Sequence, residues 1–163
     1  MTDHLPDSRQ FRTALGSFAT GVTIVTTRAA DGQPIGLTAN SFNSLSLDPP
    51  MVLWALAKSS KSLPAFAAAE HFAVHILAAD QQDLANRFAT RGADKFGGVP
   101  TTPGERTGAP LVDGACVHIE CKMHERRPAG DHAVLIGEVV GGAHGEHAPL
   151  LYHSRAFGKF AGF

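Results

Sequence analysis

The sequence contains few of the residues that build disulfide or metal scaffolds. It has two cysteines in 163 residues, Cys116 and Cys121. Residues five positions apart on a strand point to opposite faces, so a disulfide between them is not expected. Their spacing matches no common zinc knuckle, and His144 and His147 lie in a glycine-rich segment without the i, i+4 helical spacing of zinc proteases. We therefore expect no metal site.

The chain also lacks strong charge and long apolar runs. Its formal net charge is -1 and it has no long basic run, so electrostatics do not favour nucleic acid binding. No apolar run reaches the roughly 20 residues that span a bilayer, and residues 1–10 are polar without an apolar signal core. We expect a cytoplasmic protein that does not enter membranes.

Two nucleotide-binding motifs are missing as well. No G-x-G-x-x-G follows a predicted strand, and there is no P-loop, so neither a Rossmann unit nor a P-loop fold is indicated. The composition, 44% apolar and 18% charged, is that of a globular protein, and the length suits one domain over residues 1–163. Seventeen glycines and ten prolines favour many turns.

The hydrophobic pattern predicts a mainly β domain with short helices. β-Branched and alternating segments favour strands, Asp31-Gly32 favours a hairpin turn, and Asp80 and Ser62 are predicted helix N-caps. The expected helices cover residues 8–20, 65–70 and 80–89, the expected strands cover 21–27, 35–47, 51–57, 72–77, 115–125 and 132–140, and 91–110 reads as a long surface loop. This order favours a closed antiparallel barrel with helices outside; a doubly wound parallel sheet is the alternative.

The segment 115–125 alternates between two faces. We expect Ala115, Val117, Ile119, Cys121 and Met123 to point into the core. The intervening residues His118, Glu120, Lys122 and His124 should then point outward. Gly141-Gly142 is expected to end the strand that follows.

Residues 58–62 form the strongest candidate for anion binding. Lys58 and Lys61 alternate with three serines just before a predicted helix, where ammonium and hydroxyl donors favour a phosphate. A solvated lysine and serine loop explains the same pattern.

A second candidate is the small polar stretch 36–44. Asn40 and Ser41 could hydrogen-bond a flat heterocycle, with Ala39 allowing close approach. A bulged edge strand whose hydroxyls bond to the chain's own backbone is an equally good interpretation.

Three segments together resemble the flavin reductase-like family, the short-chain reductase components of two-component flavin monooxygenases. They are residues 11–26 (FRTALGSFATGVTIVT), residues 36–46 followed by Leu47-Asp48-Pro49-Pro50, and Gly130-Asp131-His132. The resemblance covers the chain from about Phe11 to Phe160. It implies an FMN-binding split β-barrel that forms a homodimer, with no metal.

The resemblance also assigns site residues. It implies that the isoalloxazine is lined by Thr38, Ala39, Asn40 and Ser41. It places the ribityl chain and phosphate on Ala55, Leu56, Ala57, Lys58, Ser59, Ser60 and Ser62. Phe96 would lie beside the flavin, His132 near the nicotinamide as the catalytic residue, and Tyr152, His153 and Arg155 in the tail that contributes to NADH binding.

The implied function is an NAD(P)H-dependent flavin reductase. It would transfer hydride from NADH or NADPH to FMN or FAD and supply reduced flavin to a partner monooxygenase, with the cofactor providing the redox chemistry. Two alternatives remain: a flavin-binding electron carrier or storage barrel without reductase turnover, and a non-enzymatic dimeric barrel that binds another ligand.

Overall fold

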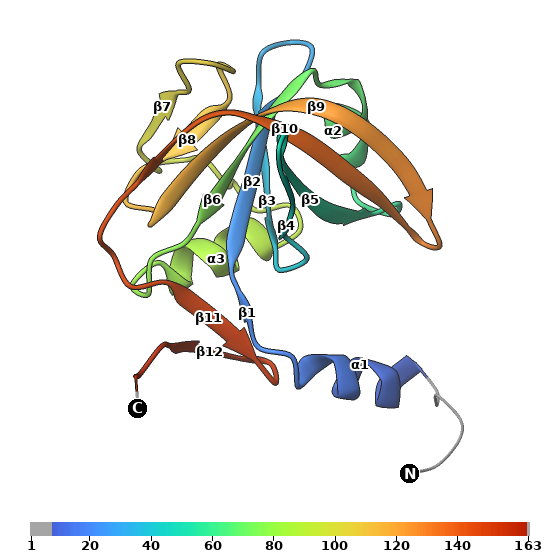
Figure 1. The fold of residues 1–163 in the computed structure, drawn as a ribbon, viewed down its shortest axis with the longest axis vertical. Coiled ribbons are helices and arrows are strands. Elements are labelled where there is room, and N and C mark those ends of the chain that lie inside the picture. The colour runs from blue at the N-terminus through green and yellow to red at the C-terminus, as the bar shows by residue number, and fades with distance from the viewer. Residues whose placement is uncertain (1–7, 163) are drawn as a thin grey trace.

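An antiparallel sheet of seven strands forms the centre of the molecule (Figure 1). The computed structural model describes residues 8–162. In spatial order the strands are β3 Pro34–Ala39, β2 Thr23–Arg28, β6 His71–Ile76, β9 Val117–Ala129, β10 His132–His144, β5 Pro50–Ala57 and β4 Asn43–Leu47. Every neighbouring pair is antiparallel. This confirms the mainly β prediction and excludes the doubly wound alternative.

The sheet does not close into a complete barrel, so that part of the prediction was wrong. The segment 35–47, expected as one strand, divides into β3 and β4, which lie at opposite edges of the sheet. The break is at Asn40–Phe42. There the Ser41 hydroxyl accepts a hydrogen bond from Ala55 N at 2.9 Å and donates to Ala55 O at 3.1 Å. The Ser41 side chain thus bonds to the backbone of β5 at the position where backbone groups would otherwise continue the β4–β5 ladder.

Three short helices lie outside the sheet: α1 Ser8–Gly16, α2 Leu63–Ala68 and α3 Gln82–Ala89. The first ends earlier than predicted, because Thr20 already pairs with Tyr152 in a second sheet. That sheet contains β1 Thr20–Gly21, β11 Leu150–His153 and β12 Ala156–Lys159. Gln81 rather than Asp80 precedes α3, and Ser62 precedes α2 without a side-chain cap bond.

The long hairpin of β9 and β10 extends further than predicted. Gly141 and Gly142 lie inside β10 instead of ending it, next to a register shift between Val139 and Gly141. The predicted loop 91–110 contains β7 Thr101–Pro103 and the start of β8 Pro110–Val112. The β7–β8 segment covers the face of β9 expected to be exposed, so Glu120, predicted to point outward, is only 5% exposed.

Two apolar clusters hold the sheet and helices together. Trp54 lies 4.9 Å from Phe66 of α2 and 6.2 Å from Phe72 of β6, measured between ring centroids. Phe88 of α3 belongs to the second cluster, on the other face of the sheet. Gly137 is required beside Phe72, because a Cβ there would lie 2.4 Å from the ring. Among the helices of the described residues, none has the length and apolarity to cross a membrane.

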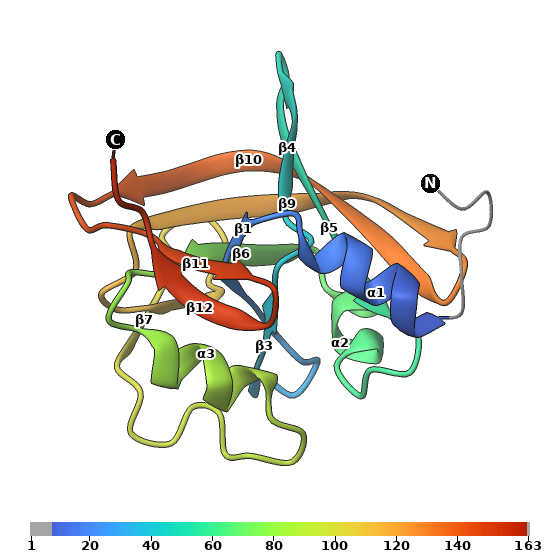
Figure 2. The ribbon, with the colours of Figure 1, turned by 90° about the horizontal axis from the view of Figure 1, so that it is seen from below.

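Figure 2 shows how the remaining elements are placed around the sheet. The β4–β5 hairpin projects away from the body of the molecule, and α1 leads into β1 with residues 9–15 exposed. Ser154 N donates to Gly16 O at 2.8 Å, which links the end of α1 to the β11–β12 turn.

Candidate functional site

A polar groove extends from the loop after β5, along β3, to the β11–β12 hairpin. It consists of two cavities of about 190 and 450 Å³, which share Thr38 and Ala89 as lining residues. The smaller cavity is lined by Leu37, Thr38, Ala57, Ser59, Ser60, Lys61, Ser62, Phe88, Ala89, Arg91, Gly92 and Lys95. The larger is lined by Val22, Thr38, Asn40, Ala85, Asn86, Ala89, Tyr152, Arg155 and Phe157. Volumes of several hundred Å³ are typical of small-molecule sites.

The smaller cavity has a strongly cationic lining. Lys61, Arg91 and Lys95 contribute positive charge, and no acidic residue lines the cavity. None of the three forms an ion pair with a residue that the structure describes. Lys95 Nζ donates to Gly36 O at 3.0 Å, and burial lowers the pKa of this ammonium. Together with the serine hydroxyls, this donor set fits a phosphate group.

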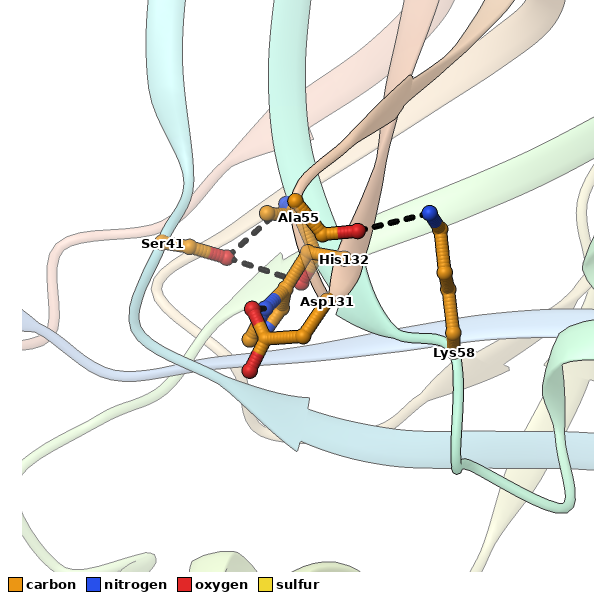
Figure 3. A network of polar contacts seen from close by, with 6 residues as sticks. Ser41, Ala55, Lys58, Asp131 and His132 are labelled. Atoms are coloured by element: carbon orange, nitrogen blue, oxygen red, sulfur yellow. Dashed lines mark hydrogen bonds and ion pairs between the residues drawn. The ribbon is translucent and has the colours of Figure 1, made fainter.

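Lys58, predicted as a phosphate ligand, follows β5 and points toward the turn that precedes β10 (Figure 3). Its Nζ donates to Gly130 O at 2.6 Å, and its backbone N donates to Asp131 O at 2.9 Å. It is not among the lining residues of either cavity. The cationic residues that line the smaller cavity are thus Lys61, Arg91 and Lys95.

His132 begins β10 and pairs with Ala57 at the end of β5. Its Nδ1 lies 2.7 Å from Asp131 Oδ1, and this hydrogen bond, with the charge of the imidazole, lowers the pKa of Asp131. His132 is not among the cavity lining residues. The Lys58, Asp131 and His132 group therefore forms a polar cluster adjacent to the groove, with its charges engaged within the cluster.

The predicted isoalloxazine residues divide between two faces of β3 and its continuation. Thr38 and Asn40 line the groove, whereas Ala39 is buried in the core. The Thr38 hydroxyl donates to Ala85 O at 2.6 Å and so joins β3 to α3. Ser41 is occupied by the backbone of Ala55. This division follows from the two-residue period of a strand.

Residues predicted for the ribityl chain divide in the same way. Leu56 is buried in the core, Ala57 lines the smaller cavity, and Ala55 bonds to Ser41. Ser59, Ser60 and Ser62 all line the smaller cavity, and Ser60 Oγ accepts from Ser62 N at 3.2 Å.

The C-terminal residues Tyr152 and Arg155 line the larger cavity opposite β3. Tyr152 packs edge-on against Phe157 at 5.2 Å. His153 points elsewhere, with its Nε2 3.3 Å from Ser154 Oγ. Phe96 packs edge-on against Phe88 at 5.0 Å and belongs to the second apolar cluster instead of the cavity lining.

Several lining residues were not in the sequence-based prediction, above all Arg91, Lys95, Asn86 and Phe157. Arg91 and Lys95 flank a short turn before Phe96. Two cations in a glycine-containing loop were the feature of the sequence that could have indicated anion binding there. Asn86 lies on a helix whose pattern predicted only its apolar face. It could be assigned only after α3 was placed against β3.

The chain belongs to the family described as the flavin reductase like domain, whose family model matches residues 15–161. This confirms the resemblance found in the sequence. The fold is in accord with that class.

Individual relatives support the assignment. The chain is 47% identical to the FMN reductase (NADH) SmoA of Agrobacterium fabrum, over 95% of this chain and 87% of that protein. It is 44% identical to the reductase component of the flavin-dependent trigonelline monooxygenase of Acinetobacter baylyi, over 91% of this chain but only 48% of that protein. The structure of the NADH:FAD oxidoreductase SgcE6 of Streptomyces globisporus, in complex with NAD and FAD fragments, matches with a TM-score of 0.90 at 39% identity, covering 95% of this chain and 93% of that one.

Proposed function

We propose that this protein is an NAD(P)H-dependent flavin reductase that reduces FMN or FAD and supplies the reduced flavin to a monooxygenase. The observation that supports this most directly is the cavity lined by Lys61, Arg91 and Lys95. It is continuous with a groove along β3 whose lining residues, apart from Arg155, are uncharged. A flavin mononucleotide has the same division, an anionic phosphate at one end and a flat heterocycle at the other. Relatives named as NADH-dependent FMN reductase and as a monooxygenase reductase component support the activity.

In this proposal the residues of the groove bind and orient the two substrates. The three cations and the hydroxyls of Ser59, Ser60 and Ser62 hold the phosphate. Thr38 and Asn40 lie along the heterocycle, and Tyr152 and Arg155 on the opposite wall contribute to binding of the nicotinamide nucleotide. The flavin, when bound, supplies the acceptor for hydride, so the protein needs to provide orientation and charge stabilisation rather than a nucleophile.

His132 is proposed as a catalytic residue that positions the nicotinamide. Asp131 accepts from Nδ1 when that nitrogen carries a proton, which leaves Nε2 free for a ligand. The cluster stands at the junction of β5 and β10, next to the groove residue Ala57. A carboxylate that holds the ring in one orientation keeps Nε2 in a constant direction.

Steady NADH oxidation with added FMN, FAD or riboflavin tests the activity. A reductase oxidises NADH continuously in the presence of catalytic flavin under air. A carrier or storage protein binds flavin, which gives it flavin absorbance, but shows no steady oxidation. A protein that neither binds flavin nor oxidises NADH would contradict the proposal and favour another ligand for the groove.

We also propose a homodimer. Phe11, Leu15 and Phe18, in and just after α1, are 43, 57 and 77% exposed, and Leu45 and Leu47 on the projecting hairpin are 47 and 92% exposed (Figure 2). Exposed apolar groups of this size are typical of protein interfaces. Light scattering should show a dimer at micromolar concentration, and Leu15→Asp with Leu47→Asp should shift it toward monomer. A monomeric parent protein would contradict this proposal.

The partner is proposed to receive reduced flavin by diffusion. With the reductase and NADH on one side of a membrane permeable only to flavin, and the oxygenase and its substrate on the other, product should form. Product that forms only when the proteins mix would instead require direct contact.

A cytoplasmic location is proposed from the thiols. Cys116 and Cys121 are both free and buried, and burial raises the pKa of Cys121 to about 12. Free thiols are typical of reducing compartments. Fractionation of cells that express the tagged protein tests this location.

A further inference from the structure

A third cavity, of about 530 Å³, lies between the β7–β8 segment and the β9–β10 hairpin, formed by elements other than those that line the flavin groove. Its lining residues are Thr102, Pro103, Glu105, Arg106, Leu111, His118, Glu120, Val140, Gly141, Gly142 and Ala143. None of them lines the groove. The cavity therefore has no role in the proposed reductase site.

Glu120 is the unusual member of this lining. The residue is 95% removed from solvent, at 5% exposure. Its Oε2 accepts three hydrogen bonds, from Arg106 N at 3.0 Å, Thr107 N at 2.9 Å and Thr107 Oγ1 at 2.6 Å. Its Oε1 accepts none from the described residues, and no lysine, arginine or histidine nitrogen in residues 8–162 lies within 4.0 Å of the carboxylate. Buried carboxylates are usually paired with a cation.

Gly141 and Arg106 lie beside this free oxygen in the cavity lining. Gly141 is paired with Glu120 across β9 and β10, so both belong to the same face of the sheet. A Cβ on Gly141 would lie 3.6 Å from Glu120 Oε1 and 2.8 Å from Arg106 Cγ. The aliphatic part of the Arg106 side chain occupies the space over Gly141, and Glu120 Oε1 lies next to it in the cavity lining.

We propose that this cavity binds a small organic monocation, an ammonium or amidinium group on a short apolar body, through Glu120 Oε1. The charged group would supply the cation that the carboxylate lacks. Leu111, Val140 and Ala143 provide apolar surface for the remainder of the ligand. At the exposed rim the charges of Glu105 and Arg106 offset each other, so the buried carboxylate of Glu120 determines the preference for a cation.

The choice of an organic cation over a metal ion follows from the ligand set. No group of three or more His, Cys, Asp and Glu side chains in the described part of the chain is arranged to hold a metal. His118 does not add a donor, because its Nε2 bonds to Val112 O at 2.8 Å. Glu120 offers a single free carboxylate oxygen beside an apolar surface. This arrangement suits a ligand that has one charged N–H donor group attached to an apolar group.

Benzylammonium and benzyl alcohol distinguish this site from nonspecific binding, because they have similar shape and differ in charge. In an NMR titration of the full-length protein saturated with FMN, benzylammonium should shift the amide signals of Thr107, Gly141 and Gly142 in a saturable manner. Benzyl alcohol should bind at least about tenfold more weakly, the scale of one charge-assisted hydrogen bond.

Two variants locate the effect. Glu120→Gln keeps an oxygen for the amides of Arg106 and Thr107 but removes the charge, and it should remove the preference for benzylammonium. Ala143→Phe fills the cavity without altering Glu120 and should abolish saturable binding, which keeps the test decisive if Glu120→Gln fails to fold. Glu105→Gln, at the exposed rim, is the matched control and should change the affinity by less than about threefold.

Equal affinity for the two probes, shifts confined to other residues, or full binding by Ala143→Phe would overturn the proposal. FMN affinity, measured on the same samples, should be unchanged in all three variants. If the parent protein did not bind flavin, that result would contradict the proposed reductase function and would leave the cation site of this cavity untouched.

Discussion

The flavin groove and the face of the sheet beneath the β7–β8 segment are both rich in polar groups, but they use them differently. In the groove, the side chains of Lys61 and Arg91 make no hydrogen bond or ion pair with any described residue. Beneath β7–β8, Thr26 donates to Pro110 O at 2.6 Å, His118 bonds to Val112 O, and Glu120 holds the amides of Arg106 and Thr107. The first region has donors left over for a ligand, whereas most donors of the second hold the chain itself.

This difference separates contributions to stability from contributions to flavin binding. Unpaired cations that face each other across a cavity contribute little to folding and repel one another. Buried polar groups with internal partners cannot be removed without leaving a partner unsatisfied. We therefore expect variants in the groove to change flavin affinity, and variants beneath β7–β8 to change the free energy of unfolding.

The largest expected effect is on FMN binding by the double variant Lys61→Ala, Arg91→Ala. It removes two charges from the phosphate end of the groove, each worth about 1.5–3 kcal/mol as a charge-assisted hydrogen bond. The dissociation constant for FMN, measured by fluorescence quenching, should rise by about 100-fold or more. The free energy of unfolding should not decrease.

Riboflavin and Lys58→Ala are the controls for this variant. Riboflavin has no phosphate, so its affinity should change by less than about threefold, as expected for the loss of distant exposed charges. Lys58→Ala should also have a small effect on FMN, because the ammonium is bonded to Gly130 O outside the cavities. Equal losses of affinity for FMN and riboflavin would show that the phosphate does not bind at this end of the groove.

The second effect is a loss of stability at acidic pH through His75. Burial lowers the pKa of His75 to about 3 from its usual 6.5, and its Nδ1 lies 2.9 Å from Ile24 O. Between these values the unfolded chain binds a proton that the folded chain does not, so stability falls as the pH decreases. The expected loss from pH 6.5 to 4.5 is about 2 kcal/mol.

Urea unfolding of the parent protein and of His75→Gln at both pH values measures this contribution. The glutamine variant does not titrate, so its loss of stability over the same interval should be smaller by about that amount. His118, whose ring centroid lies 5.2 Å away, is present in both proteins, so the two samples differ in the titration of His75 and its interaction with His118. The same pH dependence in the two proteins would show that His75 is not held neutral.

The third effect is on the rate of flavin reduction. His132→Ala removes the proposed nicotinamide contact, and stopped-flow reduction of bound flavin at saturating NADH should slow about tenfold, the effect of a lost positioning contact. Flavin affinity should change little. His124→Ala, an exposed histidine on β9, is the matched control. If the reduction rate and the NADH affinity were unchanged, His132 would not belong to the active site. The site would then consist of the groove residues alone.

The smallest effect tests the region beneath β7–β8 by itself. Thr26→Val keeps the shape of a fully buried side chain but leaves Pro110 O without its hydroxyl donor. The free energy of unfolding should decrease by about 1 kcal/mol. A change in FMN affinity at temperatures where the variant is folded would contradict the expectation that this region affects stability and not flavin binding.

The sequence by itself was sufficient for the class of fold and for part of the site. β-Branched segments and alternation predicted strands that correspond to β2, β5, β6, β9 and β10, because local backbone preference and the two-residue period act within a single strand. The segment 58–62 was identified from its donors alone, and its three serines and Lys61 do line the smaller cavity. The family was evident from three motifs.

Only the tertiary structure determined which polar groups are free and which are used. Lys58 and Lys61 are three positions apart in one loop, yet one bonds to Gly130 and the other lines the cavity, because β10 packs against one side of β5 only. Glu120 alternates like an exposed residue and is buried because a segment distant in the sequence covers it. Arg91 and Asn86 reach the groove only when the loop after α3 and the helix itself pack against β3. Contacts between segments far apart in the chain leave no periodic signal, so burial and partnership at these positions could not be predicted from local sequence.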